Sequence, residues 1–199
     1  MKEHPAADIP GYDYGTSRAA VSPVTMEELT QLKASADFTV EDERYLRMAG
    51  EVLADQAEAT VDSWRERIGA QKYLARVFYG PDGKPDDHYK AAVKRRFVQW
   101  VIDLCTRPFD QTWLDYQEEI ALRHLPEKKN KTDQAETPPV VPLRYLVAFL
   151  APIVISTKDF LGKGGHSPEQ IEKMHQAWTK AVLLTIALWS RPYTREGLW

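Results

Sequence analysis

The chain has 199 residues, with 43% hydrophobic and 28% charged residues and a net charge of -3 at pH 7. This length suits one compact domain, spanning residues 1–199, that can bury a core and enclose a cofactor. The slightly acidic balance lacks the basic excess that binding to nucleic acid or anionic lipid requires, so we expect neither partner.

Cys105 is the only cysteine, which excludes an intrachain disulfide framework and a cluster of thiolate metal ligands. It lies in an apolar run, so we expect a buried thiol rather than a reactive one. The N-terminus lacks the apolar core of a secretion signal, and no apolar run reaches membrane-spanning length. These features predict a cytoplasmic protein with no membrane partner.

Residues 1–23 are a poor helix, because prolines and turn formers interrupt them. Tyr12 and Tyr14 stand at alternate positions of this extended arm. Their rings can lie against an apolar surface while their hydroxyl groups find polar partners. The arm is therefore interpreted either as a lid over a site or as a frayed tail.

The pattern from Ser22 onward is helical, and no convincing run of alternating strand residues occurs. The predicted fold class is therefore all-α. Thr25 with Glu28, the acidic residues after Thr39, and Ser167 before Pro168 mark helix starts. The predicted helices cover residues 25–35, 40–68 with a break or bend near Gly50, 72–79, 86–106, 110–124, 143–161 and 168–189.

His124 lies at the end of the predicted helix 110–124 and just before a polar loop from Leu125 to Thr137. Trp113, Tyr116, Ile120 and His124 follow helical spacing, so the imidazole should point inward. A single histidine ligand matches haem iron, because the porphyrin supplies the equatorial donors, whereas zinc needs more ligands. A hydrogen-bonded core histidine is the alternative reading of the same spacing.

Other helices offer side chains that suit the walls of a porphyrin pocket. Phe78 ends the short helix, and the pairs Val93 with Phe97 and Phe149 with Ile153 are each four residues apart. Arg96 and the run 128–131, which holds three lysines, can neutralise haem propionates. The same pattern also fits an ordinary core and a solvated loop.

Motifs along nearly the whole chain resemble, in order, those of the protoglobins, single-domain globins of the same lineage as globin-coupled sensors. They are IPGYDYG at 9–15, AGEVLADQ at 49–56, FYGPDGKP at 78–85, AAVKRRFVQWVIDLC at 91–105, WLDYQEEIALRH at 113–124, KKNKTD at 128–133, RYLVAF at 144–149 and ALWSRPY at 187–193.

The resemblance implies a globin fold with an additional N-terminal helix, and an N-terminal arm that covers the haem. It implies haem b as cofactor, His124 as its proximal ligand, and narrow apolar tunnels to the iron. It also implies a homodimer through the last two long helices, for which we expect some of Trp178, Leu183 and Ile186 to lie between subunits.

Carried over by motif, Trp64 belongs to the distal wall, and Phe78 packs on the haem. Val93 and Phe97 should line the distal side. Phe149 and Ile153 should lie near the haem and its tunnels. Val93 cannot donate a hydrogen bond to a ligand.

Two positions depart from the family pattern. Arg65 follows Trp64 where the family usually has tyrosine, and Leu125-Pro126 replaces a more usual His-Arg. An Arg65 that faces the iron would favour anionic ligands or a developing negative charge, whereas an outward Arg65 would leave the pocket almost without donors. We expect an outward or gate-like arginine, because burial of an unpaired guanidinium is costly.

The sequence thus predicts a haem globin that reversibly binds O2, CO or NO, with no dedicated catalytic residue. The alternatives are a haem-based redox enzyme, with peroxidase or NO and nitrite chemistry, and a gas sensor that acts through a partner.

Overall fold

Capping side chains set the starts of three helices, as the sequence predicts. Reciprocal capping boxes join Thr25 to Glu28, Thr39 to Asp42 and Ser167 to Gln170. The computed structural model describes residues 9–195 and 197–199. The helices are α1 (Met26–Ser35), α2 (Val40–Leu53), α3 (Ala57–Ala70), α4 (Lys72–Ala75), α5 (Asp87–Thr106), α6 (Gln111–Leu122), α7 (Leu143–Leu161) and α8 (Pro168–Ser190).

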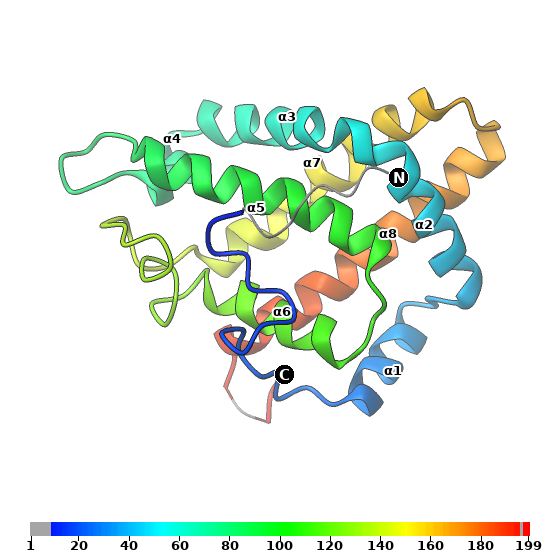
Figure 1. Cartoon of the computed structure of the whole chain (residues 1–199), viewed down its shortest axis with the longest axis horizontal. Helices are drawn as coiled ribbons and strands as arrows, with labels where there is room; N and C mark the ends of the chain where they lie inside the picture. The colour runs from blue at the N-terminus through cyan, green and yellow to red at the C-terminus, as the bar shows by residue number, and fades with distance from the viewer. Residues whose placement is uncertain (1–8, 196) are drawn as a thin grey trace.

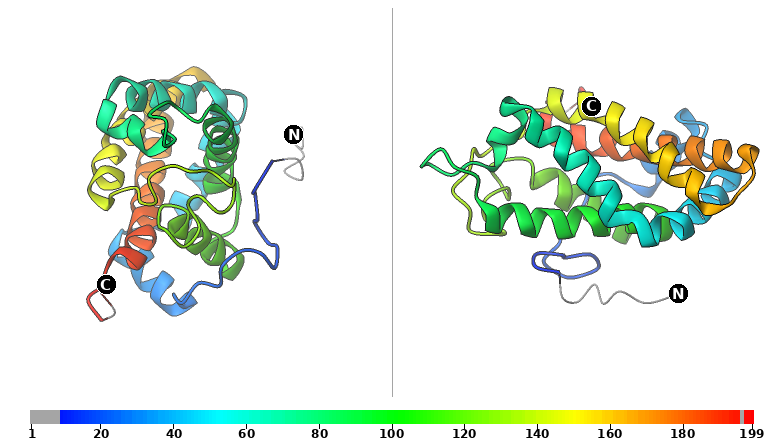
Figure 2. Two further views of the ribbon diagram at one scale, coloured as in Figure 1. Left: turned by 90° about the vertical axis from the view of Figure 1, so that its left-hand side faces the viewer. Right: turned by 90° about the horizontal axis from the view of Figure 1, so that it is seen from above.

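The chain is all-helical within the described residues, apart from one isolated bridge between Tyr79 and Pro85. Helix α8 runs through the middle of the bundle and contacts α2, α6 and α7 (Figure 1). The view from above in Figure 2 shows α5 and α7 on opposite sides, with α3 crossing between them. Trp64, Trp113 and Trp178 are fully buried between these layers.

The predicted division of residues 40–68 into two helices is confirmed, and two predicted boundaries are shifted by a few residues. The break expected near Gly50 is a short 3-10 turn at Ala54–Gln56, between α2 and α3. Helix α6 ends at Leu122, so His124 lies in the turn beyond it rather than within the helix. Cys105 is buried, as expected, and burial raises the pKa of its thiol.

Helix α7 is apolar but exposed. Together with the following turn it spans Leu143–Gly164, which is long and apolar enough to cross a membrane. This finding is contrary to the sequence expectation. Only 17% of the apolar segment is buried inside the protein. This one helix packs along α8, and its length and composition do not by themselves make it a membrane span. Val147 and Ile155 on α7 and Leu183 on α8 are 50%, 69% and 48% exposed.

We predict that Gly50→Ala destabilises the protein, because a Cβ there would lie 2.7 Å from Cβ of Cys105 where α2 crosses α5. Overpacking of this kind costs about 1–3 kcal/mol, more than the helix propensity that alanine gains. Urea denaturation measures the loss. Gly69→Ala on α3 is the control, since nothing lies within 4 Å of its Cβ, and it should be neutral or stabilising. Equal effects of the two substitutions would refute close α2–α5 packing.

Candidate functional site

A deep cavity of about 490 Å³ lies between α3, α5, α7, α8 and the end of α6. This volume falls in the range of cofactor and ligand pockets, roughly 300–1,000 Å³. Apolar and aromatic side chains dominate its wall. Among the residues that line it are Phe78, Tyr89, Val93, Phe97, Trp100, Tyr116, Ile120, His124, Phe149, Ile153, Ile186 and Trp189.

The imidazole of His124 faces this cavity with one ring nitrogen committed to the backbone. Its Nδ1 lies 2.9 Å from the carbonyl oxygen of Ile120, and this geometry assigns the proton to Nδ1. Burial lowers the pKa of His124 to about 4, so the ring is neutral at pH 7. The lone pair of Nε2 is therefore available to a metal or a hydrogen-bond donor.

Three further contacts fix the turn that carries His124. Its carbonyl oxygen accepts a hydrogen bond from the amide of Val141 at 2.8 Å and lies 3.4 Å from the hydroxyl of Tyr193. That hydroxyl donates to the carbonyl of Val141 at 2.6 Å. Trp189 of α8 packs against the imidazole with ring centroids 5.3 Å apart. The ring therefore has little freedom to turn away from the cavity.

Lys129 is a buried cation in the cavity wall. Only 2% of the residue is exposed, and its Nζ donates to the carbonyl of Val77 at 2.9 Å and to Oγ1 of Thr137 at 2.6 Å. The ring of Tyr89 lies 5.0 Å from Nζ. No carboxylate pairs with it among the residues that the structure describes, and burial lowers its pKa to about 8.

Arg96 also lines the cavity, but its charge is already neutralised. Asp133 accepts two hydrogen bonds from its guanidinium, at 2.9 and 2.6 Å, and the carbonyl of Pro10 accepts a third. Lys128, from the lysine run, is paired with Glu119. Of the cations predicted to meet haem propionates, only Lys129 and Lys131 have no carboxylate partner in the described chain, and Lys131 is exposed.

The described part of the N-terminal arm braces the cavity wall from outside, whereas residues 1–8 lie outside the described residues. Arg123, next to His124, donates to Asp13 at 2.8 Å, and the hydroxyl of Tyr12 donates to Asp103 at 2.6 Å. The rings of Tyr12 and Tyr14 both meet Tyr116 edge-on. Both rings thus lie against the wall, as the sequence suggests, and the blue segment in Figure 1 runs from the edge of α5 across α6.

Gly11 explains how the arm comes so close to the wall. Its φ of +69° suits glycine, and a Cβ would lie 2.5 Å from Cγ2 of Thr132 and 2.9 Å from Nη1 of Arg96. Any larger residue would push the arm away from the cavity wall.

Arg65 lines the cavity from the α3 side. Its Nη1 donates to the carbonyl oxygen of Lys90 on α5 at 3.1 Å, and burial lowers the pKa of the guanidinium. The side chain is half-buried. This position is intermediate between the two orientations that the sequence left open.

Trp64 does not line the cavity, in contrast to its predicted place in the distal wall. It is fully buried behind Phe97, with ring centroids 5.3 Å apart, and its Nε1 donates to Oγ of Ser156 at 2.9 Å. The indole is held there because its only donor is satisfied on α7. Trp64 therefore affects the cavity indirectly, by packing against Phe97, which lines it.

The structure brings the other predicted residues together around one cavity: Arg65, Phe78, Val93, Arg96, Phe97, His124, Phe149 and Ile153. Sequence reasoning did not single out Tyr89 or Trp189 as wall residues, or Lys129 apart from its neighbours. The signal for Trp189 is its place in the motif ALWSRPY, whereas nothing local distinguishes Lys129 from the other lysines of its run.

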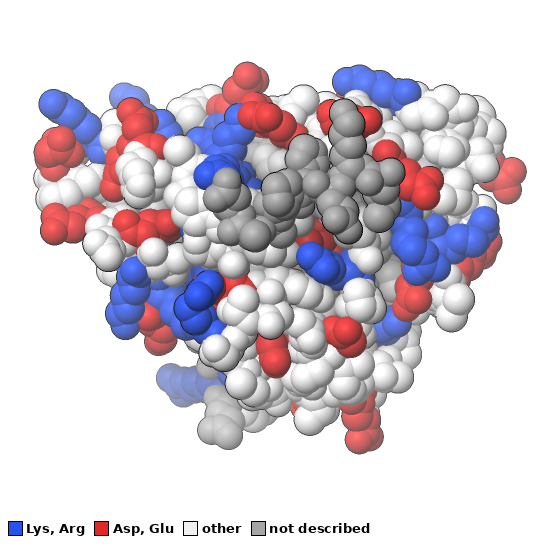
Figure 3. Space-filling view, viewed as in Figure 1, with Lys and Arg blue, Asp and Glu red and all other residues white. Residues whose placement is uncertain are grey.

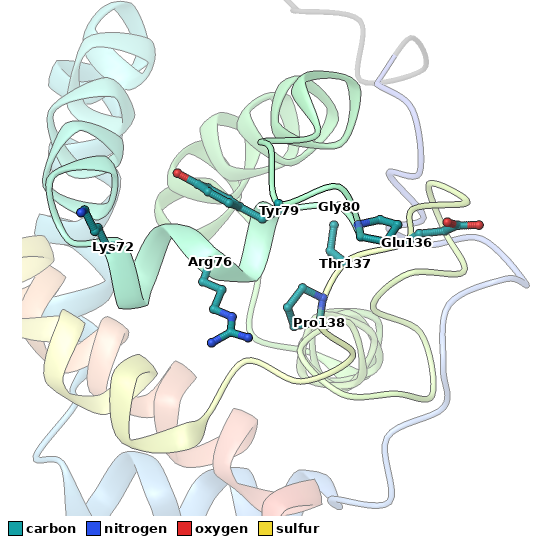
Figure 4. A pocket seen from close by; sticks show the side chains of 9 residues that line it. Lys72, Arg76, Tyr79, Gly80, Glu136, Thr137 and Pro138 are labelled. Carbon is teal, nitrogen blue, oxygen red and sulfur yellow. The ribbon is translucent and has the colours of Figure 1, made fainter.

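A second, more open hollow of about 680 Å³ lies outside this wall, between the loop after α4 and the loop before α7. Lys72, Arg76 and Glu136 stand around it in Figure 4. It shares Tyr79 with the inner cavity. Its charged rim and openness make it the weaker candidate for a cofactor.

Charges elsewhere are mixed. On the face in Figure 3, lysine and arginine are interspersed with aspartate and glutamate. Within the described residues, no group of three or more His, Cys, Asp and Glu side chains can hold a metal ion. The cavity with His124 is therefore the strongest candidate for a functional site within the described residues.

The chain that forms this cavity is similar to known proteins in sequence and in fold. The sequence model of the protoglobin family matches residues 25–199. No curated protein sequence matches the chain. The globin domain of the Geobacter sulfurreducens globin-coupled sensor has a similar fold, with a TM-score of 0.67 and 16% sequence identity over 86% of this chain and 99% of that chain.

We predict that Lys129 makes the stability of the cofactor-free protein depend on pH. Between pH 8 and 10.5 the native state has lost the proton of Lys129 while the unfolded state keeps it, so this lysine contributes a rise with pH to the free energy of unfolding. Buried groups whose pKa is raised, such as Cys105 and Tyr89, contribute a fall over the same range, so the effect of Lys129 is read from the difference between variants. Relative to wild type, Lys129→Met should lose a rise of about 1–3 kcal/mol across this range, measured by urea denaturation. Lys131→Met, at an exposed position of the same run, should follow the wild-type curve. A wild-type pH dependence in Lys129→Met would exclude this contribution.

Proposed function

We propose that this chain, which belongs to the protoglobin family, holds haem b in the cavity beside His124 and reversibly binds diatomic gases there. Family membership gives the chain a haem-globin, gas-binding role. The observation that carries the finer proposal is the neutral His124 in an apolar cavity, with Nδ1 held by the backbone and Nε2 free. We propose O2, CO and NO as the ligands.

The residues of the cavity fit a haem group. A flat apolar macrocycle needs aromatic and branched walls, which Phe78, Val93, Phe97 and Phe149 supply. Its two carboxylates need cations, and Lys129 is a buried cation without a carboxylate partner in the described chain. Haem, when bound there, would supply an iron that can bind a diatomic gas.

His124 is the residue that would hold the haem iron in this proposal, through Nε2. Its Nδ1 donates to Ile120, which fixes the tautomer and raises the basicity of Nε2. Trp189 and the anchored turn hold the plane of the imidazole. No proton has to be removed from Nε2 at neutral pH, because burial already keeps the ring uncharged.

Lys129 and Arg96 have different roles in this proposal, because one is free to pair with the cofactor and the other is already paired with Asp133. We propose that Lys129 pairs with a haem propionate, which would restore the charge that burial disfavours. Arg96 stays with Asp133 and ties the arm to the wall through Pro10. The remaining wall excludes water and protects a bound gas from side reactions.

The first test is the absorption spectrum. Protein reconstituted with haem should show a Soret band and a five-coordinate ferrous form that binds CO, whereas His124→Ala should lose haem or lose that ferrous spectrum. His88→Ala, at an exposed histidine, is the control and should behave as wild type. Unchanged spectra in His124→Ala would reject the ligand assignment, and absence of a Soret band in wild type would reject haem binding.

We also propose a homodimer through the exposed faces of α7 and α8. Val147, Ile155 and Leu183 form an apolar surface of the kind that a subunit interface covers. Trp178 and Ile186, which the sequence suggested for this interface, instead face the interior, and Ile186 lines the cavity. The interface therefore uses the outward positions of both helices.

Ile155→Glu should convert the dimer into a monomer, because it places a charge in the centre of the proposed apolar interface. Sedimentation velocity at micromolar concentration measures the change. Val21→Glu is the matched control, since Val21 is 81% exposed on the N-terminal arm, whose adjacent amides bond to Glu119 and Asp115 of α6, and its substitution should leave the dimer intact. A wild-type monomer would contradict the proposal.

A further inference from the structure

Arg65 is the one feature of the cavity wall that a binding site for neutral gases does not need. It brings a positive charge to the wall of a largely apolar cavity that Ile68, Val93 and Phe97 also line. Desolvation of a cation in such surroundings is unfavourable unless an anion or several hydrogen bonds compensate it. Among the described residues its guanidinium donates one hydrogen bond, to the carbonyl of Lys90, and most of its five donors have no protein acceptor there.

The nearby carboxylates are committed to another cation. Asp62, one turn before Arg65 on α3, accepts a hydrogen bond from Lys94 at 2.8 Å, and Glu58 accepts one from the same amine at 2.7 Å. Asp62 influences Arg65 only through space. Glu66 is exposed and forms no ion pair with Arg65 within the described chain. Because Lys94 binds both of these carboxylates, the guanidinium of Arg65 has no carboxylate partner among the described residues.

The position of Arg65 also gives it access to solvent. Gly69, on the next turn of α3, both lines the cavity and is exposed, so the cavity reaches the surface close to Arg65. Helix α3 lies on the opposite side of α5 from α6, whose end carries His124 (Figure 1). An arginine at this wall faces the cavity from the side away from the proposed iron ligand.

We propose that Arg65 makes this cavity selective for small monovalent anions, which exchange the Lys90 carbonyl for a charge-assisted hydrogen bond to the guanidinium. Such a bond is about twice as strong as one between neutral groups, and apolar walls strengthen it further. A neutral diatomic gas gains little from the same donor. The inference rests on the proposed haem function for its ligand class, but it concerns the opposite wall of the cavity.

The haem-bound test compares an anionic with a neutral ligand. In the ferric protein, Arg65→Met should weaken azide binding about 10- to 100-fold, the loss expected for one charged hydrogen bond, and Arg65→Lys should restore part of it. The affinity of the ferrous protein for CO should change less than about threefold. Arg67→Met removes the same charge from an exposed position of α3 and should leave azide affinity within about twofold of wild type.

A second test needs no haem. In the haem-free protein, Trp100 and Trp189 line the cavity, so their fluorescence reports which quenchers enter. Iodide should quench wild type more strongly than Arg65→Met, whereas neutral acrylamide should quench both equally. The Arg67→Met variant should match wild type with both quenchers.

The two tests separate the possible failures. A missing Soret band would overturn the proposed function and leave the iodide result to decide on Arg65. Normal spectra with equal azide affinity in wild type and Arg65→Met would overturn this inference alone. Equal losses of azide and CO affinity would also overturn it, because they would make Arg65 a steric gate rather than a selector of charge.

Discussion

The hydrogen bond between Nδ1 of His124 and the carbonyl of Ile120 is the contact on which the site depends. It forms in the tightened turn that ends α6. There the amide of His124 bonds to Ala121 rather than to Ile120, and the Ile120 carbonyl accepts the amide of Arg123 at 3.1 Å. The second lone pair of the Ile120 carbonyl accepts the proton of the ring. The turn that ends α6 therefore also fixes the tautomer of His124.

The cations of the wall fall into two groups according to whether the protein neutralises them. Arg96 and Arg123 are matched by Asp133, Asp13 and Glu119, and these pairs hold the arm and the loop in place. Lys129 and Arg65 have only neutral acceptors in the described chain. Charge left unmatched in an apolar cavity is costly for the protein alone, and it marks the places where a ligand's charge is stabilised.

Local sequence rules predicted the helices well, because caps and periodicity act within a few residues. The Thr25 and Ser167 capping boxes set helix starts, and spacing by four placed Val93 with Phe97 on one wall. These rules failed where contacts between residues distant in sequence determine the orientation or burial of a side chain. Trp64 turns toward Ser156 of another helix, and Lys129 is buried by Val77 and Thr137, although its neighbour Lys128 remains partly exposed. Such choices are made by tertiary packing and leave no local pattern.

The anchoring of the arm has a consequence for the order in which the chain matures. Tyr12 bonds to Asp103, and Asp13 to Arg123, across sequence separations of 91 and 110 residues. During synthesis the arm leaves the ribosome before its partners on α5 and at the end of α6, which are made about a hundred residues later. The arm is therefore among the last segments to dock, because contacts this distant in sequence form late and slowly. Until then, the side of the nascent domain that the arm covers remains open.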